Sequence, residues 1–167
     1  PALPSMTRIS VPERGVESLF GTQDENLRLI ERAFKVRIHG HGTELTIEGE
    51  EEGTLLARRV LEQLGGLMKE GYSVGTGDVR LATDLFRRDA DTRLRAAKAL
   101  GNDPRSASKE PLATALLNDS YAPIRRLCAE YLYADGSERS KQALLKARDD
   151  SDDGVRSLVA KYIGSFD

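Results

Sequence analysis

Tryptophan is absent from this sequence, and aromatic side chains together make up only 5% of it. A core built on large rings is therefore excluded, and we expect packing through leucine, alanine and valine. Apolar residues reach 39% and charged residues 31%, which is typical of a folded soluble protein rather than a disordered one. The length of 167 residues suffices for one or two small domains with a buried core.

Cysteine occurs once, as Cys128, so an internal disulfide is excluded. Its neighbours, Arg-Arg-Leu-Cys-Ala-Glu, indicate a helix in which the thiol belongs to the core. No apolar run approaches the roughly 18 residues that span a bilayer, and no signal-peptide pattern is visible. We therefore expect a cytoplasmic protein with no membrane partner.

A strong excess of charge of either sign is also missing. Residues 1–76 carry 9 basic and 12 acidic side chains, whereas residues 77–167 carry 16 and 15. Neither half has the strongly basic balance that is typical of a nucleic-acid clamp.

Residues that could form a catalytic or metal site are sparse. His39 and His41 lie in one predicted hairpin, without a cysteine or a third ligand at metal-binding spacing, so we predict no metal site. The phosphate-binding motif G-x-x-x-x-G-K-[ST] is absent, and neither a serine–histidine nor a cysteine–histidine pair has support. We therefore predict no enzymatic activity, no cofactor and no small-molecule substrate.

The first part of the chain, residues 1–76, combines strand and helix patterns. In chain order they predict a strand over 7–11, helices over 13–20 and 25–34, strands over 36–39 and 44–48, and a helix over 51–69. Asp24 is predicted as the N-cap of the second helix, and Gly40–Thr43 as a hairpin turn. This order predicts a small sheet backed by helices.

The second part, residues 77–167, contains an internal repeat. Segments that begin at Thr92, Ile124 and Val155 align, with their first residues 32 and 31 positions apart. An arginine, an alanine and an aliphatic residue recur in phase, and two further columns precede them at a spacing of 31. These columns are Arg93, Arg125, Arg156; Ala97, Ala129, Ala160; Leu100, Leu132, Ile163; Leu81, Leu112, Ala143; and Leu85, Leu116, Ala147.

Three antiparallel helix pairs explain this repeat, because one pair alone cannot bury its apolar face. Acidic turns separate the helices of each pair, at Asp89 and Asp91, at Asp119, and over 149–153. We predict that the in-phase arginines are structural and bond the acidic turn of their own or the adjoining repeat.

Residues 77–167 resemble HEAT-like repeats, of the short kind also found in phycobilisome lyases. The acidic turn, the pairs Ile124-Arg125 and Val155-Arg156, the in-phase alanine and the closing Leu-Gly of Ala99–Gly101 carry this resemblance. It implies an interaction scaffold that binds a protein partner through its helices.

Residues 8–86 resemble the N-terminal region of PhoH-like proteins. The stretch from Ser18 to Glu31 carries this resemblance, together with 36–39 and 45–49. That region is similar to a KH domain, whose G-x-x-G loop clamps nucleic-acid backbone. The equivalent loop is Gly21–Asp24, and the implied RNA contacts are Gly21, Thr22, Gln23, Arg28, Arg37 and His39.

Two departures from these families weaken the RNA-binding hypothesis. Asp24 replaces the second glycine of the loop and puts a carboxylate where phosphate would lie. Helical repeats also stand where the ATPase domain of PhoH-like proteins would begin. We therefore predict an α+β protein, with a KH-like β-α-α-β-β-α domain over 1–76 and three HEAT-like helix pairs over 77–167. The expected function is a non-enzymatic scaffold, and the alternative is a weak KH-type RNA-binding module.

Overall fold

The computed structural model describes residues 3–166, apart from the side chains at positions 106 and 107, and divides into two compact units, residues 1–87 and 88–167. The first unit contains β1 (Pro4–Ser10), α1 (Val16–Phe20), the 3-10 turn η1 (Thr22–Asp24), α2 (Glu25–Phe34), β2 (Arg37–His41), β3 (Glu44–Glu50), α3 (Glu51–Lys69) and α4 (Thr76–Asp84). The second contains α5 (Ala90–Asn102), the 3-10 turn η2 (Ser106–Lys109), α6 (Glu110–Asn118), α7 (Ala122–Asp135), α8 (Glu138–Lys146) and α9 (Asp153–Gly164). The predicted class, a small sheet with helices followed by helical repeats, is confirmed.

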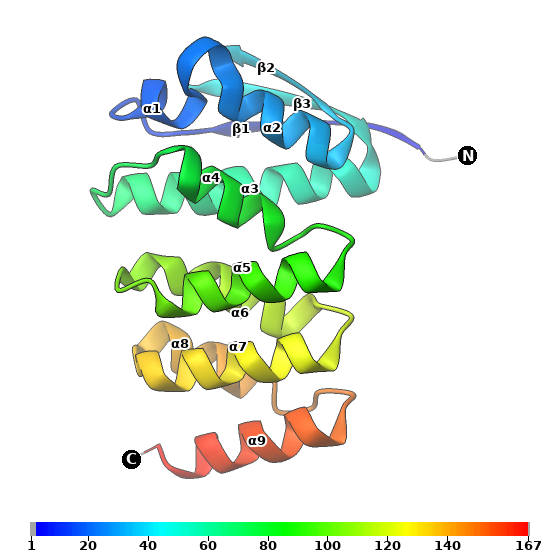
Figure 1. Ribbon diagram of the computed structural model, residues 1–167, viewed down its shortest axis with the longest axis vertical. Helices are drawn as coiled ribbons and strands as arrows, with labels where there is room; N and C mark the ends of the chain where they lie inside the picture. The colour runs from blue at the N-terminus through cyan, green and yellow to red at the C-terminus, as the bar shows by residue number, and fades with distance from the viewer. Residues whose placement is uncertain (1–2, 167) are drawn as a thin grey trace. The chain divides into compact units, whose positions relative to one another are not determined.

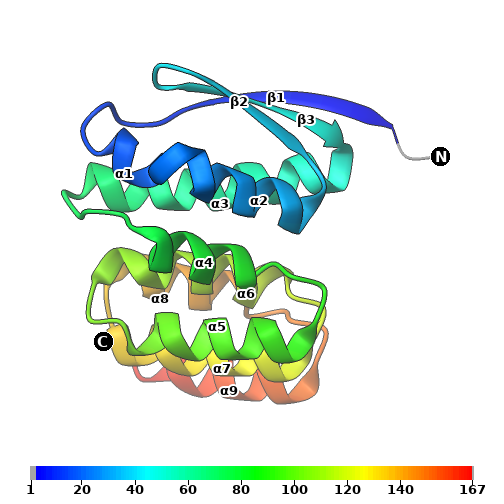
Figure 2. The same ribbon diagram turned by 45° about the horizontal axis from the view of Figure 1, so that its top comes forward.

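The first unit is built on an antiparallel sheet with the strand order β1-β3-β2. Helices α1, α2 and α3 cover one face of this sheet, and the other face is open (Figure 2). Strand residues alternate between the two faces, so Ile38, Leu45 and Ile47 are buried beneath the helices. The helices contribute Leu19, Ile30, Leu61 and Leu64 to the same core.

Strand β1 begins at Pro4, three residues before the predicted start. Pro4 is tolerated because β1 is an edge strand and this residue needs no N–H toward β3. Helix α3 has the predicted bounds, and the helix over 25–34 is also confirmed.

Asp24 does not cap α2 with its side chain, so that prediction is wrong. Its backbone is left-handed, with φ 59° and ψ 27°, and its side chain accepts no cap hydrogen bond. Gln23 is left-handed as well. A capping residue needs an extended backbone for its oxygen to reach the free N–H groups of the first turn, and the tight entry through η1 prevents this.

The compact units divide after Arg87 because α4 packs on α2 and α3 of the first unit. The predicted domain boundary after residue 76 separates two sequence patterns and stays a prediction.

The second unit consists of two layers of helices (Figure 1). Helices α5, α7 and α9 lie side by side in one layer, and α6 and α8 form the other. Contacts between α5 and α7, between α7 and α9, and between α6 and α8 therefore join equivalent positions of successive repeats. Fully buried aliphatic residues fill the space between the layers: Leu112, Leu116, Ile124, Leu132, Leu144, Val155 and Val159.

Candidate protein-interaction surface

The in-phase arginines connect successive repeats of the second unit. Arg93 donates from Nε and Nη2 to the Asp119 carboxylate, at 2.9 and 3.1 Å, and from Nη1 to the carbonyl of Arg88 in its own turn. Arg125 repeats this pattern one step along, with 2.9 and 2.8 Å bonds to the Asp150 carboxylate and one to the Asp119 carbonyl. The prediction that these arginines bond acidic turns is confirmed for both.

Arg156 keeps only the part of the pattern that lies within its own turn. Its Nη1 donates to the Asp150 carbonyl at 2.7 Å, and its Nη2 bonds the carboxylate of Asp153. Two arginines therefore bind each of these turns. In the turn between α6 and α7, the Asp119 carboxylate binds Arg93 and the Asp119 carbonyl binds Arg125. In the turn between α8 and α9, the Asp150 carboxylate binds Arg125 and the Asp150 carbonyl binds Arg156.

Burial and bonding act in opposite directions on these carboxylates. Burial by itself would raise the pKa of Asp150, but the hydrogen bonds from Arg125 and the Asp152 backbone, together with the charges of Arg125 and Arg156, hold that pKa below its usual value. The same bonds raise the pKa of Arg125. The pair is therefore charged at neutral pH and joins successive repeats.

The alanine and cysteine of α7 belong to the core between repeats. Ala129 and Cys128 are fully buried, as predicted for the thiol. Burial raises the pKa of Cys128 to about 12, so this thiol is neither ionised nor reactive at neutral pH.

Tyrosines line the C-terminal ends of α7 and α9. Tyr133 and Tyr162 stack with their ring centroids 4.0 Å apart and an angle of 8° between the planes. The Tyr133 hydroxyl accepts a 2.9 Å hydrogen bond from Ser165. Tyr133 keeps 39% of its surface exposed although it is a large ring. This pair therefore offers a preorganised aromatic surface.

Tyr131 makes the equivalent contact one repeat earlier. Its ring lies against the backbone of Gly101, where an added Cβ would stand 2.3 Å from the ring. Tyr131 and Tyr162 occupy one column of the repeat alignment, and Gly101 and Tyr133 occupy another. The sequence analysis did not select these tyrosines, although the shared column was the signal that could have found them.

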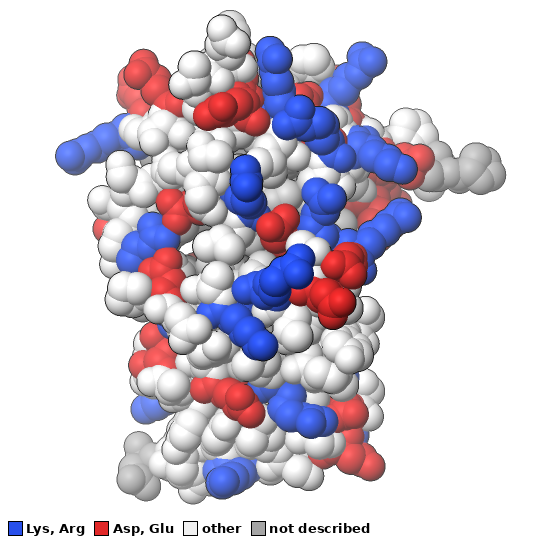
Figure 3. All heavy atoms as spheres, in the orientation of Figure 1, with Lys and Arg blue, Asp and Glu red and all other residues white. Residues whose placement is uncertain are grey.

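The charges over the helical layer that carries these tyrosines are mixed. Figure 3 shows Lys and Arg interspersed with Asp and Glu over the layer of α5, α7 and α9, without an extended patch of one sign. Lys141 lies 5.5 Å from the centre of the Phe166 ring, next to the last turn of α9. Such a surface suits a polar rim around an aromatic centre better than the phosphates of a nucleic acid.

The residues predicted to contact RNA lie in the first unit, on two sides of its sheet. Arg37 and His39 are exposed on the open face of β2, where His39 approaches the Glu48 carboxylate at 3.9 Å. Arg28 is exposed on α2, in the helical layer that covers the opposite face. Gly21, Thr22 and Gln23 form the entry to α2.

Gly21 is required by its backbone, with φ 78° and ψ 177°, and by its neighbour Asn26. An added Cβ would lie 2.9 Å from Asn26 Nδ2, which donates to the carbonyls of Leu19 and Ser18. Phe20 lies close to Gly40, so this loop adjoins the end of β2. On α2, the Glu31 carboxylate accepts a 2.9 Å bond from the Ile38 N–H at the free edge of β2.

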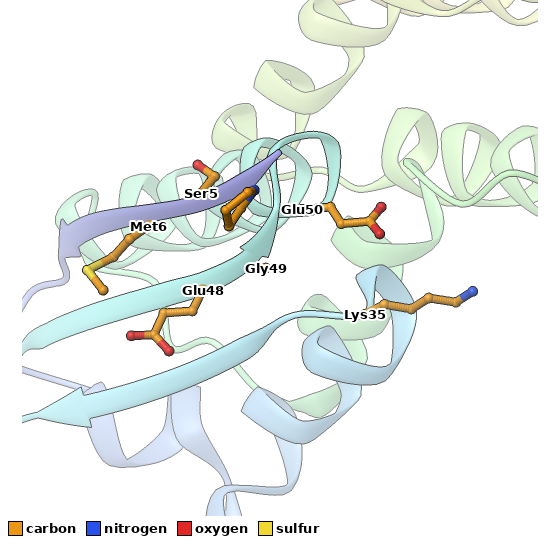
Figure 4. Close-up of a pocket in the computed structure, with 7 residues that line it drawn as sticks. Ser5, Met6, Lys35, Glu48, Gly49 and Glu50 are labelled. Atoms are coloured by element: carbon orange, nitrogen blue, oxygen red, sulfur yellow. The ribbon is translucent and has the colours of Figure 1, made fainter. Parts of the chain in front are cut away.

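A hollow of about 630 Å³ opens beside β1 (Figure 4). It is lined by Pro4, Ser5, Met6, Lys35, Glu48, Gly49 and Glu50. Within residues 3–166, no three His, Cys, Asp or Glu side chains are grouped closely enough to hold a metal ion. No helix in that range is both long and apolar enough to cross a membrane.

The sequence of residues 81–164, half of the chain, matches the family of HEAT repeats. The chain belongs to the HEAT repeat family. This agrees with the in-phase columns and with the arginine pattern between turns.

The HEAT repeat chain is also similar to PhoH-like proteins. Those of Mycobacterium bovis and Mycobacterium tuberculosis are 38% identical to it over 72 residues, covering 43% of this chain and 20% of theirs. That of Bacillus subtilis is 31% identical over 72 residues, covering 43% and 23%. The HEAT repeat chain thus spans about a fifth of the length of these curated relatives. No solved structure matches it.

Proposed function

We propose that this protein is a non-enzymatic scaffold that binds a protein partner at the C-terminal ends of α7 and α9. The stacked pair of Tyr133 and Tyr162 is the observation that carries this proposal. The Tyr133 ring is partly exposed, and tyrosine is enriched among the residues that dominate protein interfaces.

The second unit supplies the rigidity that such a surface requires. Buried ion pairs from Arg93 and Arg125 fix each repeat against the next. The stack itself is held by Ser165, so little side-chain entropy remains to be lost on binding. A polar rim with charges of both signs completes a surface of the kind that proteins recognise.

The test is affinity capture from nuclease-treated cell extract with the wild-type protein and with Tyr133→Ser/Tyr162→Ser. We expect the wild type to retain a defined protein that the double variant loses. Tyr72→Ser, which alters another exposed tyrosine in the first unit, is the matched control and should retain it. Equal capture by all three proteins would contradict the site. A protein that the wild type captures from untreated extract but not from nuclease-treated extract would contradict the scaffold.

A second candidate function is weak RNA binding by the first unit as a KH-like module. The strand order β1-β3-β2 and the glycine loop between α1 and α2 support this candidate. Two carboxylates oppose it. Asp24 stands in the loop, and Glu31 already occupies the Ile38 N–H that a base could otherwise reach.

Fluorescence anisotropy with labelled single-stranded RNA tests this candidate. We expect little binding by the wild type, and tighter, salt-sensitive binding by Asp24→Gly at low ionic strength. Tight binding by the wild type that Asp24→Gly leaves unchanged would show that the loop is not the site.

A further inference from the structure

The outer edge of β1, on the side away from β3, has no neighbouring strand among residues 3–166. The Glu51 N–H donates to the Leu3 carbonyl at 3.3 Å, and the Val11 N–H donates to the Thr43 carbonyl at 2.9 Å. Odd-numbered residues of β1 therefore direct their backbone groups to β3, and even-numbered residues direct theirs outward. Within residues 3–166 no strand lies on that side, because the sheet order is β1-β3-β2.

This edge lacks the protection that the opposite edge has. On β2, the Glu31 carboxylate covers the outward N–H of Ile38. On β1, no residue within 3–166 gives such cover to the outward N–H groups of Met6, Arg8 and Ser10, and Met6 is 60% exposed. A seven-residue open edge with an exposed apolar side chain is a template for another strand.

We propose that β1 pairs with β1 of a second copy of this chain, antiparallel, about a two-fold axis at Thr7. In this register Met6 lies opposite Arg8 of the second copy, and Pro4 lies opposite Ser10. Each outward N–H of one copy then meets an outward carbonyl of the other. Proline lacks an N–H, so its place at the end of the ladder costs least.

The neighbouring registers are less favourable for identifiable reasons. Moving the axis to Arg8 sets two arginines directly opposite each other, which is destabilising in a strand pair. Moving it to Met6 sets Pro4, which has no N–H, opposite Arg8 next to the centre of the ladder, so the outward carbonyl of Arg8 loses its donor. The sequence of the strand therefore selects the axis at Thr7, and the resulting interface is self-complementary.

The hollow beside β1 carries two carboxylates, Glu48 and Glu50, that complement the charge of Arg8 from the second copy in this register. Met6 lies opposite Glu48 in the sheet, Pro4 lies opposite Glu50, and all four residues line the hollow. The side chains of Met6 and Glu48 project on the same side of the sheet (Figure 4). Lys35 lines the hollow on the side of β2, away from β1.

Arg8 of the second copy reaches this hollow from the adjacent strand. Its Cα lies two strand spacings, about 10 Å, from that of Glu48, a span that an arginine and a glutamate cover together. The arginine stem packs along Met6, and the guanidinium approaches the carboxylates of Glu48 and Glu50. Two-fold symmetry forms this contact twice. Because a single strand pair is a small interface, we expect a weak dimer that depends on protein concentration.

The first test compares Arg8→Pro with Arg8→Thr in the full chain by sedimentation equilibrium from micromolar to millimolar protein. Proline removes an outward N–H without disturbing the ladder to β3, whereas threonine keeps that N–H. We expect the wild type to dimerise, Arg8→Thr to dimerise more weakly, and Arg8→Pro to be monomeric. Circular dichroism and thermal melting establish that each variant is folded. A wild type that is monomeric throughout, or a dimer that Arg8→Pro leaves intact, would overturn the proposal.

The second test exchanges charges across the interface. Arg8→Glu alone and Glu48→Lys/Glu50→Lys alone should each be monomeric, because like charges then meet in both halves of the dimer. An equimolar mixture should form a heterodimer, because every such contact again joins opposite charges. A mixture that stays monomeric, or single variants that dimerise as well as the wild type, would show that Arg8 does not enter this hollow.

Discussion

Arg125 and Asp150 form a two-bonded ion pair between successive repeats, with only 10% and 8% of their side chains exposed. A third bond joins Arg125 to the backbone carbonyl of Asp119. The side-chain carboxylate of the same Asp119 binds Arg93. Arg93 and Arg125 thus each tie one turn to the next, at the N-terminal ends of α5, α7 and α9.

Removing either partner of the Arg125–Asp150 pair should lower the stability of the folded protein. Arg125→Ala leaves the buried Asp150 carboxylate without its countercharge and with the Asp152 N–H as its remaining described donor, and we expect the free energy of unfolding to fall by about 3–5 kcal/mol. Arg126→Ala is the control, because its contact with Asp152 spans 3.7 Å and its side chain is 48% exposed. That variant should lose about 0–1 kcal/mol. Urea denaturation measures both, and equal losses would refute the role of the buried pair.

The second unit should lose stability in acid. Bonds from Arg105 lower the pKa of Asp103 from 3.8 to about 2, and those from Arg125 lower the pKa of Asp150 despite its burial. Because these pKa values are lower in the folded than in the unfolded state, their contribution is complete above pH 3.8 and is lost as the pH falls toward 2. Thermal melting across this range should show a decline that is smaller in Asp103→Asn.

Gly101→Ala should be destabilising, whereas Gly164→Ala should not. The two glycines occupy the same column of the repeat, but an added Cβ at Gly101 would stand 2.3 Å from the Tyr131 ring and one at Gly164 meets nothing within 4 Å. We expect Gly101→Ala to lower the free energy of unfolding by about 1–3 kcal/mol through overpacking. Gly164→Ala should be neutral or stabilising by up to about 1 kcal/mol. A reversed order in chemical denaturation would contradict the contact.

Asp24→Gly should raise stability rather than lower it. The left-handed backbone of Asp24 favours glycine, and no side-chain cap is lost, so we expect a gain of up to about 1 kcal/mol. Asp152 is the contrasting case, because its carboxylate accepts the Val155 N–H at 2.9 Å as a true cap of α9. Asp152→Ala should cost about 1 kcal/mol. Differential scanning calorimetry of both variants tests the distinction, and a loss with Asp24→Gly would restore the capping interpretation.

The sequence by itself determined the elements and the repeat. Apolar spacing predicted both α2 and α3, because the side chains that face a core recur with the period of the helix. Arg93 and Arg125 could be assigned to acidic turns from their phase alone. The spacing of apolar residues can be read from a short stretch of sequence, and each repeat shows the same spacing.

Only the tertiary structure decided which groups meet. It selected Asp119 and Asp150 as the arginine partners, stacked Tyr133 on Tyr162, and gave Asp24 a left-handed backbone in place of a capping role. It also set Arg37 and His39 on the open face of the sheet, apart from the helical layer that carries Arg28. These outcomes depend on contacts between residues distant in the chain and on how the backbone enters each helix, neither of which residue spacing encodes.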